Sequence, residues 1–529
     1  MNTKEKEPWI IIGDYIDTWG DATRVGLPMA DLKVHTSVLG TTGSGKSTFL
    51  RHLACQFFWL GGTVIVIEPH GDLILDPEDG ILACMPQDQL HRAAVLDFAG
   101  PSPPQFNLAG GGLRYGRSVA VDMAMSCIRV VEDASWEGAV RMREILENTL
   151  HVLLAVLGEE ASMLDMQRFF TDSKFKDEIL TLADLEVGES KDYWRRFLAE
   201  LETNQQTTYE EVMQYPLRRI GGFLRNEYLR RSLALPELSK NQSLNLEKLM
   251  NADEPTMVLV PLQETKIGDN TKRVLGTLLM KEITNVFMAR SDLARTERKQ
   301  TLIIIDEFAD LAGGEIGQIV NKLLAQARKF GASVVLATQS LTQLPIDVRN
   351  EVKTNTNIKI ILRPADLSDA KLAWELLGSD LLVPTDFMSI ERFCGYARVL
   401  VHKAPQPPFY FHALPPTKMW NGYGPELTPS YSKKPNSKLF SEIQELAKTN
   451  MQSTLKRLVK LSDKEFAEVV NAQVQFNQWT SNNLIHHPNQ IPQTNKTRAL
   501  RLSRMHFGLP WWLTEAQYRR LRFKGMRIT

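Results

Sequence analysis

Hydrophobic and polar positions along the chain alternate between two patterns. Short runs rich in β-branched residues are apolar at nearly every position, which is typical of strands covered on both faces. Longer stretches between them repeat apolar residues with the period of a helix. The predicted strands are Val34–Leu39, Thr63–Glu68, Ala93–Asp97, Met257–Pro261, Leu302–Asp306, Ser333–Thr338 and Ile358–Leu362. This alternation predicts an α/β fold with a mostly parallel sheet flanked by helices.

Two stretches depart from the alternation. Residues 117–250 carry only helical periodicity, which predicts an all-α domain inserted between two strands. Beyond Ala404 a proline-rich segment, read as a linker or arm, is followed by a helical, basic region. In that region Ser462 with Glu465, and Thr514 with Gln517, are predicted capping boxes that mark helix starts.

A glycine-rich sequence follows the first predicted strand and precedes a helical pattern. It matches the phosphate-loop motif GxxxxGK[ST], in which glycines let backbone N–H groups turn inward as an anion-binding nest. Lys46 is expected to reach the β- and γ-phosphates, and Ser47 to ligate Mg²⁺. The alternative, an ordinary glycine-rich turn, is disfavoured by the strand–loop–helix context. We therefore expect ATP and Mg²⁺ as cofactors, with the nucleotide-binding set Gly40, Thr41, Thr42, Gly43, Ser44, Gly45, Lys46, Ser47 and Thr48.

Two adjacent acids end the apolar strand that begins at Thr301. Asp306 is expected to hold the Mg²⁺ shell, as the corresponding Asp does in P-loop NTPases, and Glu307 to act as general base towards water. The alternative is a strand-to-loop boundary with exposed acids. Lys46 and Asp306 lie 260 residues apart, a separation too long for a compact nucleotide kinase. The spacing favours a motor whose sheet carries a large insertion.

The overall charge balance conceals an asymmetry. The 529 residues contain 62 Lys+Arg and 62 Asp+Glu, which on its own argues against a nucleic-acid partner. Residues 430–529, however, hold 17 basic and 6 acidic side chains, so the rest of the chain is acidic. The basic end also contains several aromatic residues, and basic and aromatic side chains together suit nucleic acid or protein docking. A solvated face over a small core is the third interpretation.

Cysteine usage and apolar stretches indicate the compartment. Cys55, Cys84, Cys127 and Cys394 are isolated, so neither a zinc site nor a disulfide framework is expected, and a reducing environment is indicated. We found no signal-peptide pattern at the N-terminus and no apolar run long enough to cross a membrane. The sequence therefore predicts a cytoplasmic protein, with peripheral attachment at the inner membrane only through partners.

Several motifs together resemble the HerA/FtsK superfamily, and most of all the type IV coupling proteins of conjugation and the HerA-like DNA translocases. The motifs are the phosphate loop, Glu68–Leu73, Leu302–Glu307 and Ala337–Ser340, and the similarity covers roughly residues 10–414. The resemblance implies a RecA-like P-loop ATPase that assembles as a hexameric ring and moves DNA through a central pore. The expected parts are an N-terminal extension (1–33), the ATPase domain (34–116 and 251–414), the all-α insert (117–250), and a proline-rich linker with a basic helical region (415–529).

The family pattern assigns two further residues. Gln339 matches the polar sensor of the γ-phosphate, and Arg328 matches the arginine finger supplied by a neighbouring subunit. A planar guanidinium suits that role because it can neutralise charge that develops on the transferred phosphoryl group. The alternatives are a hydrogen-bonded strand-end amide for Gln339 and a solvated helix-end cation for Arg328. One departure is Glu68, where the family usually has Asp.

The expected function is therefore an ATPase coupled to DNA translocation, like the coupling proteins. One alternative is a HerA-like motor partnered with a nuclease in DNA processing or defence. Another is a type IV secretion ATPase that acts on protein, and a further one is a nucleotide-gated scaffold that hydrolyses poorly. Expected partners are single- or double-stranded DNA, further copies of the chain, and a relaxase, a nuclease or a secretion channel.

Overall fold

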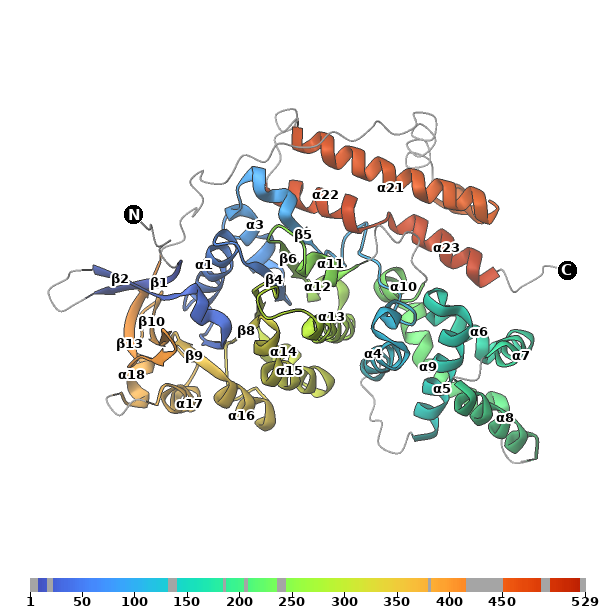
Figure 1. The fold of residues 1–529 in the computed structure, drawn as a ribbon, viewed down its shortest axis with the longest axis horizontal. Coiled ribbons are helices and arrows are strands. Elements are labelled where there is room, and N and C mark those ends of the chain that lie inside the picture. The colour runs from blue at the N-terminus through green and yellow to red at the C-terminus, as the bar shows by residue number, and fades with distance from the viewer. Residues whose placement is uncertain are drawn as a thin grey trace.

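One large mixed sheet organises the molecule, and a computed structural model describes residues 8–16, 22–131, 140–183, 187–203, 208–235, 244–378, 382–414, 451–486 and 495–523. Eleven strands follow the order β2-β1-β13-β10-β9-β3-β8-β7-β4-β6-β5. Figure 1 shows the helices packed around this sheet, with the N-terminal hairpin at one end and a group of helices at the other. The strand bounds are β1 Trp9–Ile16, β2 Ala22–Pro28, β3 His35–Leu39, β4 Thr63–Glu68, β5 Ala93–Val95, β6 Met257–Pro261, β7 Thr301–Ile305, β8 Ala332–Thr338, β9 Thr356–Ile361, β10 Cys394–Arg398 and β13 Phe409–Ala413.

The parallel half of the sheet runs from β9 to β5, and every neighbouring pair within it is parallel. All seven strands predicted from apolar runs are found there, with ends that shift by one or two residues. The predicted α/β fold is thus confirmed. The strands β3, β4, β6, β7 and β8 are buried at every position, because helices cover both faces of the sheet.

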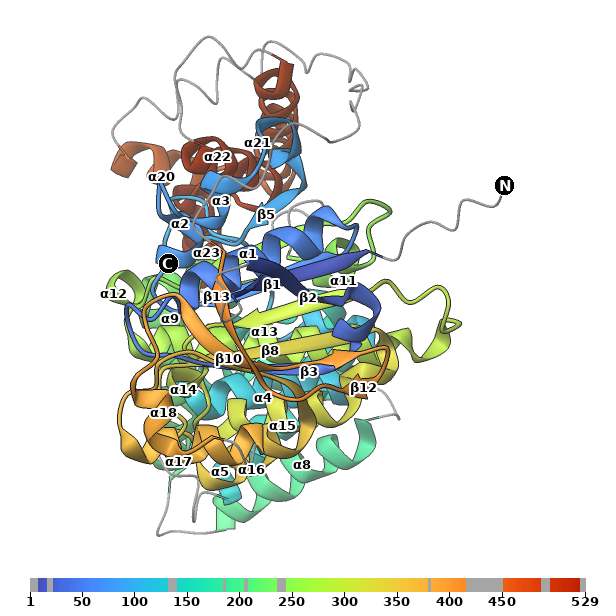
Figure 2. The same cartoon turned by 90° about the vertical axis from the view of Figure 1, so that its left-hand side faces the viewer.

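The antiparallel half consists of β2, β1, β13 and β10, which extend the sheet beyond β9. None of these strands was predicted. Gly13 of β1 lies opposite Ala413 of β13, so residues from the N-terminal extension complete the sheet beside a strand from the other end of the ATPase region. Figure 2 shows this hairpin next to β13 and β10.

Each face of the sheet has its own hydrophobic core, since alternate side chains of a strand point to opposite faces. One core joins Val64, Leu302 and Ile304 to helix α1 (Lys46–Trp59), to α2 (Asp72–Leu75) and α3 (Ile81–Cys84), and to the β1–β2 hairpin. The other joins Ile65 and Ile303 to α13, α15, α16 and α17. These four helices are Asp269–Ala289, Gly314–Gln326, Ile346–Asn355 and Leu367–Leu377.

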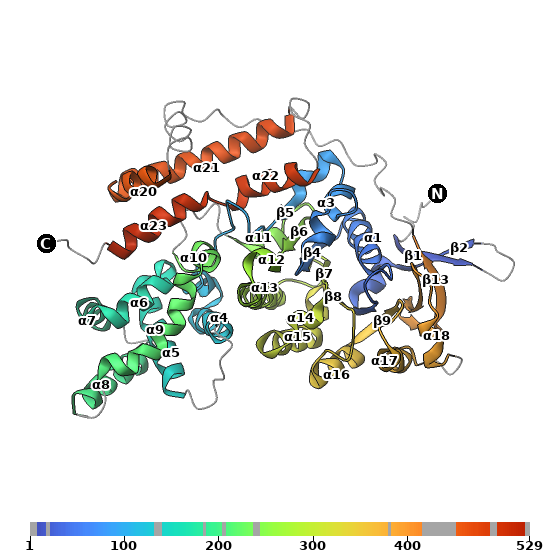
Figure 3. The same cartoon turned by 180° about the vertical axis from the view of Figure 1, so that it is seen from behind.

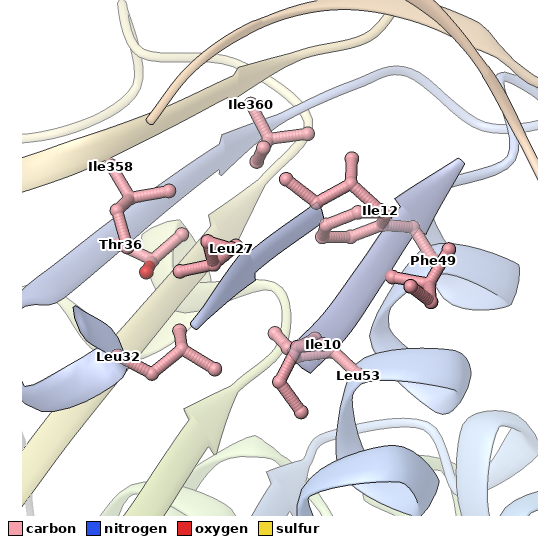
Figure 4. A pocket seen from close by; sticks show the side chains of 10 residues that line it. Ile10, Ile12, Leu27, Leu32, Thr36, Phe49, Leu53, Ile358 and Ile360 are labelled. Atoms are coloured by element: carbon pink, nitrogen blue, oxygen red, sulfur yellow. The ribbon is translucent and has the colours of Figure 1, made fainter. Parts of the chain in front are cut away.

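A small apolar cavity lies between the hairpin and α1 (Figure 4). Its volume is about 10 Å³, the lower limit for one water molecule. The one hydroxyl in its lining belongs to Thr36, and this Oγ1 is buried without a hydrogen-bond partner among the described residues. The remaining lining side chains are Ile10, Ile11, Ile12, Leu27, Leu32, Phe49, Leu53, Ile358 and Ile360.

From residue 117 to 250, the described residues between β5 and β6 form helices joined by short loops, with no strand among them. Its first helix, α4 (Arg117–Val130), is anchored to α15, because Glu315 accepts from Ser126 at 2.8 Å and pairs with Arg129 at 2.7 Å. Figures 1 and 3 show the helices of the insert gathered at the end of the sheet opposite the β1–β2 hairpin. They are α4, α5 (Val140–Leu157), α6 (Met163–Thr171), α7 (Ser173–Leu182), α8 (Gly188–Thr203), α9 (Tyr209–Arg225), α10 (Glu227–Leu233) and α11 (Leu246–Met250).

The described part of the basic C-terminal region forms four helices: α20 (Met451–Val459), α21 (Asp463–His486), α22 (Asn495–Phe507) and α23 (Trp511–Phe523). Helices α20, α21 and α23 share a small hydrophobic core of their own, whereas Ala499 and Leu502 of α22 join the core beside α1. The predicted capping box of Ser462 and Glu465 is present at the start of α21. The one predicted at Thr514 is wrong: α23 begins earlier, at Trp511 just after Pro510, because proline suits the residue before or at a helix start.

The C-terminal helices pack along the β5 edge of the sheet (Figure 3). The Ser503 hydroxyl of α22 accepts from Val95 N–H at 2.8 Å, so a side chain satisfies the exposed strand edge. The proline-rich linker was predicted to begin after Ala404, but Pro405, Pro407 and Pro408 lie just before β13 and belong to the ATPase region. Its remainder, residues 415–450, lies outside the described residues. No helix among those described is long and apolar enough to cross a membrane.

Candidate active site

The phosphate loop connects β3 to α1 at the carboxyl end of the parallel strands. Its entry is held by two neighbouring strands, since Gly40 N–H donates to Thr338 O (3.1 Å) and Thr41 N–H to Arg363 O (3.0 Å). Gly43 and Gly45 have φ of 78° and 107°, conformations that favour glycine. Helix α1 begins at Lys46 without a side-chain cap, so the N–H groups of its first turn are available to an anion. Ser47 lies exposed in that turn.

Lys46 lies between the two predicted acids. Its Nζ is 2.6 Å from Asp306 Oδ1 and 2.7 Å from Glu307 Oε1, although the residues are 260 positions apart. The acids reach it because Asp306 N–H continues the ladder to Ile67 O and Glu307 adopts a left-handed φ of 45°. Burial lowers the pKa of Lys46, but the charges of Asp306 and Glu307 outweigh burial and raise it overall. The ammonium group is therefore held charged by the acids.

Gln339 joins this cluster from the end of β8. Its Nε2 donates to Glu307 Oε1 at 2.7 Å, and its Oε1 accepts from the Thr42 hydroxyl at 3.1 Å. One amide thus bridges the phosphate loop and the expected general base. A movement of the phosphate loop on nucleotide binding would therefore shift Gln339 and, through its hydrogen bond, Glu307.

Arg328 lies at the opposite end of the parallel strands, beside the amino end of β8. It belongs to the short 3-10 helix η7 (Ala327–Phe330), which precedes β8, whereas the end of β8 contacts the phosphate loop. Seven strand residues separate the two ends, a length of about 20 Å. The Arg328 side chain is exposed there. The structure therefore does not bring Arg328 together with Lys46, Asp306, Glu307 and Gln339 in one chain.

Glu68 is a third carboxyl beside the cluster. It ends β4, is only 2% exposed, and accepts from His70 N–H at 3.2 Å, while its Oε2 has no partner among the described residues. Burial raises the pKa of Glu68 to about 8, and the Asp306 charge adds to this shift. At neutral pH the Glu68 carboxyl is therefore largely protonated.

The residues present fit Mg²⁺ and ATP. Asp306 and Glu307 already pair with the ammonium group of Lys46 at hydrogen-bond distance, so the structure stabilises positive charge at this point. Magnesium sites on nucleotides commonly take one carboxylate and one hydroxyl, with phosphate and water oxygens completing the shell. Asp306 and Ser47 would be those ligands. Among the described residues there is no group of three or more His, Cys, Asp or Glu side chains suited to a dedicated metal site.

Two residues at the site escaped the sequence analysis. Asp369 of α17 accepts from Leu341 N–H (2.9 Å) and Thr342 N–H (3.1 Å), and so holds the loop that follows Gln339. Phe393, just before β10, donates its N–H to Ser44 O at 2.9 Å. Neither has a sequence signal, because their proximity depends on strand order rather than on spacing along the chain.

Comparisons with known proteins match two parts of the chain. Residues 10–74 match the family described as the central domain of helicase HerA, and residues 233–387 match the DNA-binding domain of type IV secretion-system coupling proteins. A probable DNA double-strand break repair helicase HerA from Methanocaldococcus jannaschii is 25% identical over 378 residues, which cover 66% of this chain and 66% of that relative.

Two solved structures are similar to this chain, and the first of them shares its fold. The structure of VirB4 of Thermoanaerobacter pseudethanolicus has a TM-score of 0.52 at 14% identity and covers 78% of this chain and 98% of that one. The plasmid coupling protein TrwB in complex with ADP and Mg²⁺ has a TM-score of 0.46 at 15% identity and covers 74% and 87%. The two family matches, which include the phosphate loop and the strand of Asp306, together with the HerA relative, support a HerA/FtsK-type, coupling-protein-like ATPase.

Proposed function

We propose that this protein is an ATP-driven DNA translocase that works as a ring of identical subunits, with six as the expected number. The observation that carries the proposal is the position of two groups at opposite ends of the parallel strands. The cluster around Lys46 lies at the carboxyl end, and the exposed Arg328 lies at the amino end. An arginine about 20 Å from its own nucleotide can complete only another subunit's site. Hydrolysis would then be coupled between neighbours, as a translocating ring requires.

The residues of the cluster divide the work. Lys46 would leave the acids to bind the β- and γ-phosphates, and Asp306 with Ser47 would hold Mg²⁺, which would neutralise phosphate charge. Glu307, released from Lys46, accepts a proton from the attacking water. Gln339 orients Glu307 through its 2.7 Å hydrogen bond, and Arg328 of the neighbouring subunit stabilises the transferred phosphoryl group.

We further propose that the parts of the chain have separate tasks. Residues 34–116 and 251–414, completed by the β1–β2 hairpin, form the ATPase unit. The insert (117–250) lies at one end of the sheet and would receive the cargo. Its ion pairs with α15, the helix that leads to Arg328, give it a direct connection to the finger.

The test is to measure ATP hydrolysis with and without single- and double-stranded DNA, together with the mass of the assembly. We expect DNA to stimulate hydrolysis and the active species to be a closed oligomer. Absence of both DNA stimulation and DNA binding at low salt would contradict the proposal. For the finger, Lys46→Ala and Arg328→Ala proteins should be inactive alone and regain part of the activity when mixed; no recovery despite confirmed mixing would argue against Arg328.

A second candidate is a HerA-like motor that processes DNA ends with a nuclease. The 25% identity to a relative named as a double-strand break repair helicase favours it. It predicts stimulation by double-stranded ends, whereas a conjugative role predicts stimulation by single strands. The same hydrolysis assay with linear, circular and single-stranded DNA separates the two.

A further inference from the structure

The hydrolytic cluster fixes the direction in which a bound nucleotide must extend. Asp306, Glu307 and Gln339 follow β7 and β8, and they mark where the γ-phosphate lies. The phosphate-loop strand β3 has β8 on one side and β9, followed by β10, on the other. A triphosphate laid across the loop with its γ end towards β7 and β8 therefore directs its nucleoside towards β9 and β10.

A single turn occupies that side of the loop. Phe393 precedes β10 and donates its N–H to Ser44 O at 2.9 Å, while its own carbonyl accepts from Ala413 N–H at 2.7 Å. The ring lies directly against the loop: a Cβ on Gly45 would come within 2.7 Å of Phe393 Cδ1. The turn is thus joined to the phosphate loop by backbone and by side chain.

The backbone of this turn is strained. Phe393 has a φ of 63°, in the left-handed region that bulky residues rarely adopt. Such a conformation costs on the order of 1–3 kcal/mol and is found preferentially where a ligand or reaction requires it. Here the strain holds the aromatic ring beside Gly45 rather than letting it turn away from the loop.

Two exposed arginines complete the surroundings. The guanidinium carbon of Arg392 lies 4.6 Å from the centre of the Phe393 ring, so it presents a flat, charged face next to the loop. Arg363 lies two residues after the end of β9, and its carbonyl accepts from both the N–H and the hydroxyl of Thr41. Guanidinium planes and aromatic rings both stack on purines, and arginine also neutralises phosphate oxygens.

We propose that the Arg392–Phe393 turn, with Arg363, is the subsite for the nucleoside end of ATP, in which the purine base stacks on the Arg392–Phe393 pair. The proposal rests on the proposed function, because it takes the cluster of Lys46 and Glu307 to be the γ-phosphate end. It assigns recognition of the base and ribose to residues that follow β9 and precede β10 rather than to the phosphate loop itself.

The test compares a ligand that has a nucleoside with one that lacks it. Calorimetric titration of the full chain with ADP and with inorganic tripolyphosphate, both with Mg²⁺, gives two dissociation constants for each variant. For Arg392→Ala and for Phe393→Leu we expect the Kd for ADP to rise about tenfold, as loss of a desolvated cation–π or stacking contact implies, with the Kd for tripolyphosphate unchanged. Arg295→Ala, an exposed arginine near the start of β7, is the matched control and should change neither value.

The remaining outcomes are distinct. If the variants raise the Kd for ADP and the Kd for tripolyphosphate equally, the turn only supports the shape of the phosphate loop and the subsite is refuted. If neither Kd rises, the nucleoside lies elsewhere, and the proposal is again refuted. A wild-type protein that binds neither ligand would overturn the proposed function itself, whereas normal binding without DNA stimulation would overturn only translocation.

Discussion

Glu307 has two partners at the site that hold it in opposite roles. Lys46 binds its Oε1 as an ion pair, and Gln339 donates to the same oxygen. While the lysine is paired, it occupies the carboxylate oxygen to which Gln339 also donates. Transfer of Lys46 to the phosphates would leave Glu307 held by Gln339 alone, so we expect the proposed general base to act only when nucleotide is bound.

The variant Glu307→Gln separates binding from hydrolysis. The amide keeps the shape of the side chain but cannot accept a proton, so we expect ATP binding to persist and kcat to fall by about 10²–10⁴. Single-turnover hydrolysis and equilibrium binding of ATP measure the two effects. Glu375→Gln, which changes an exposed acid paired with Lys353, is the control. Normal turnover in Glu307→Gln would refute its role as the base.

Thr36 is a polar residue at an apolar position. Its hydroxyl lines the cavity of Figure 4 without a partner, and a buried unsatisfied hydroxyl costs about 1–3 kcal/mol. Thr36→Val keeps the volume and removes the polar atom, so we expect the free energy of unfolding to rise by about 1 kcal/mol. Thr36→Ala enlarges the cavity and should lower it. Denaturant unfolding compares the three proteins; a loss of stability in Thr36→Val would show that the hydroxyl is satisfied in solution.

His35 makes stability depend on pH. Burial lowers its pKa to about 4, and its Nδ1 accepts from Val334 N–H, which requires the neutral ring. An unfolded histidine titrates near 6.5, so between pH 6.5 and 4 the unfolded chain binds a proton that the folded chain does not. The free energy of unfolding therefore falls as pH falls through this window, by about 2 kcal/mol at pH 5.

The variant His35→Gln removes this one contribution. Above pH 7 we expect wild type to be the more stable protein, because the ring links β3 to β8 and to Leu324 O. The difference between the two proteins should shrink by about 2 kcal/mol from pH 7 to pH 5 in urea unfolding. A difference that stays constant with pH would mean that His35 does not titrate in this range.

At the scale of elements, the strands that helices cover on both faces were predicted correctly from the sequence. Strands such as Thr301–Ile305 are apolar throughout because helices pack on each face, and that pattern is visible without the structure. The strands β1, β2, β10 and β13 escaped because they mix exposed, charged and glycine positions at one side of the sheet. Their pairing depends on contacts between the two ends of the ATPase region.

The same limit applied to the candidate site. The GxxxxGK[ST] motif predicted the phosphate loop, and the end of the apolar strand predicted Asp306 and Glu307, because both signals lie within a few residues of the chain. Phe393 beside Ser44 could not be found, since its approach depends on β10 lying next to β9. The residues of the motifs could thus be predicted from the sequence. The residues that surround them, such as Phe393, could not, because the antiparallel half of the sheet determines their position.

The element that carries Arg328 is held by side chains from elsewhere. Three carbonyls of the segment Leu324–Phe330 accept hydrogen bonds: Leu324 O from His35 (2.9 Å), Lys329 O from Arg298 (2.7 Å) and Phe330 O from Arg290 (3.3 Å). Arg290 is fully buried and also binds Met250 O at the exit of the insert. The position of Arg328, the proposed finger, is therefore tied to the insert.

Arg298→Ala tests whether this support matters for catalysis. Arg298 is only partly buried, so its loss should leave the fold intact while the backbone of η7 loosens. We expect kcat to fall about tenfold with the KM for ATP unchanged, because the finger acts on the transition state. Mixing with Lys46→Ala protein should restore part of the activity, since those subunits supply intact fingers; mixing with Arg328→Ala protein should not.

Recovery with Arg328→Ala protein but not with Lys46→Ala protein would mean that Arg298 acts within its own nucleotide site, contrary to the prediction. Arg295→Ala, close by in the chain and exposed, should behave as wild type in every mixture. Circular dichroism and assembly mass of Arg298→Ala exclude simple misfolding as the cause of a low rate.

On the scale of the whole molecule, the surplus positive charge of the C-terminal region is partly used inside the protein. Arg504 pairs with Asp97 at 3.0 Å, and the ring faces of Trp511 and Tyr518 are covered by Arg231 and Arg230 of the insert. Two of the aromatic side chains considered for stacking on bases are thus engaged in holding α23 to α10. This favours docking within the protein over direct contact of these rings with DNA.

Docking of α23 can be tested by exchanging one ion pair. Arg230 lies 3.0 Å from Glu515, and both side chains are largely buried. Arg230→Glu places two acids together at this contact, so the C-terminal helices should separate from the insert and expose the β5 edge. Hydrogen exchange in α22, α23 and β5 should then be faster by roughly ten- to hundredfold, as loss of about 1.4–2.8 kcal/mol implies. The double variant Arg230→Glu with Glu515→Arg restores opposite charges and should slow exchange again. If the single variant exchanges like wild type, or the double variant does not recover, the four helices are held to the ATPase by contacts other than this one.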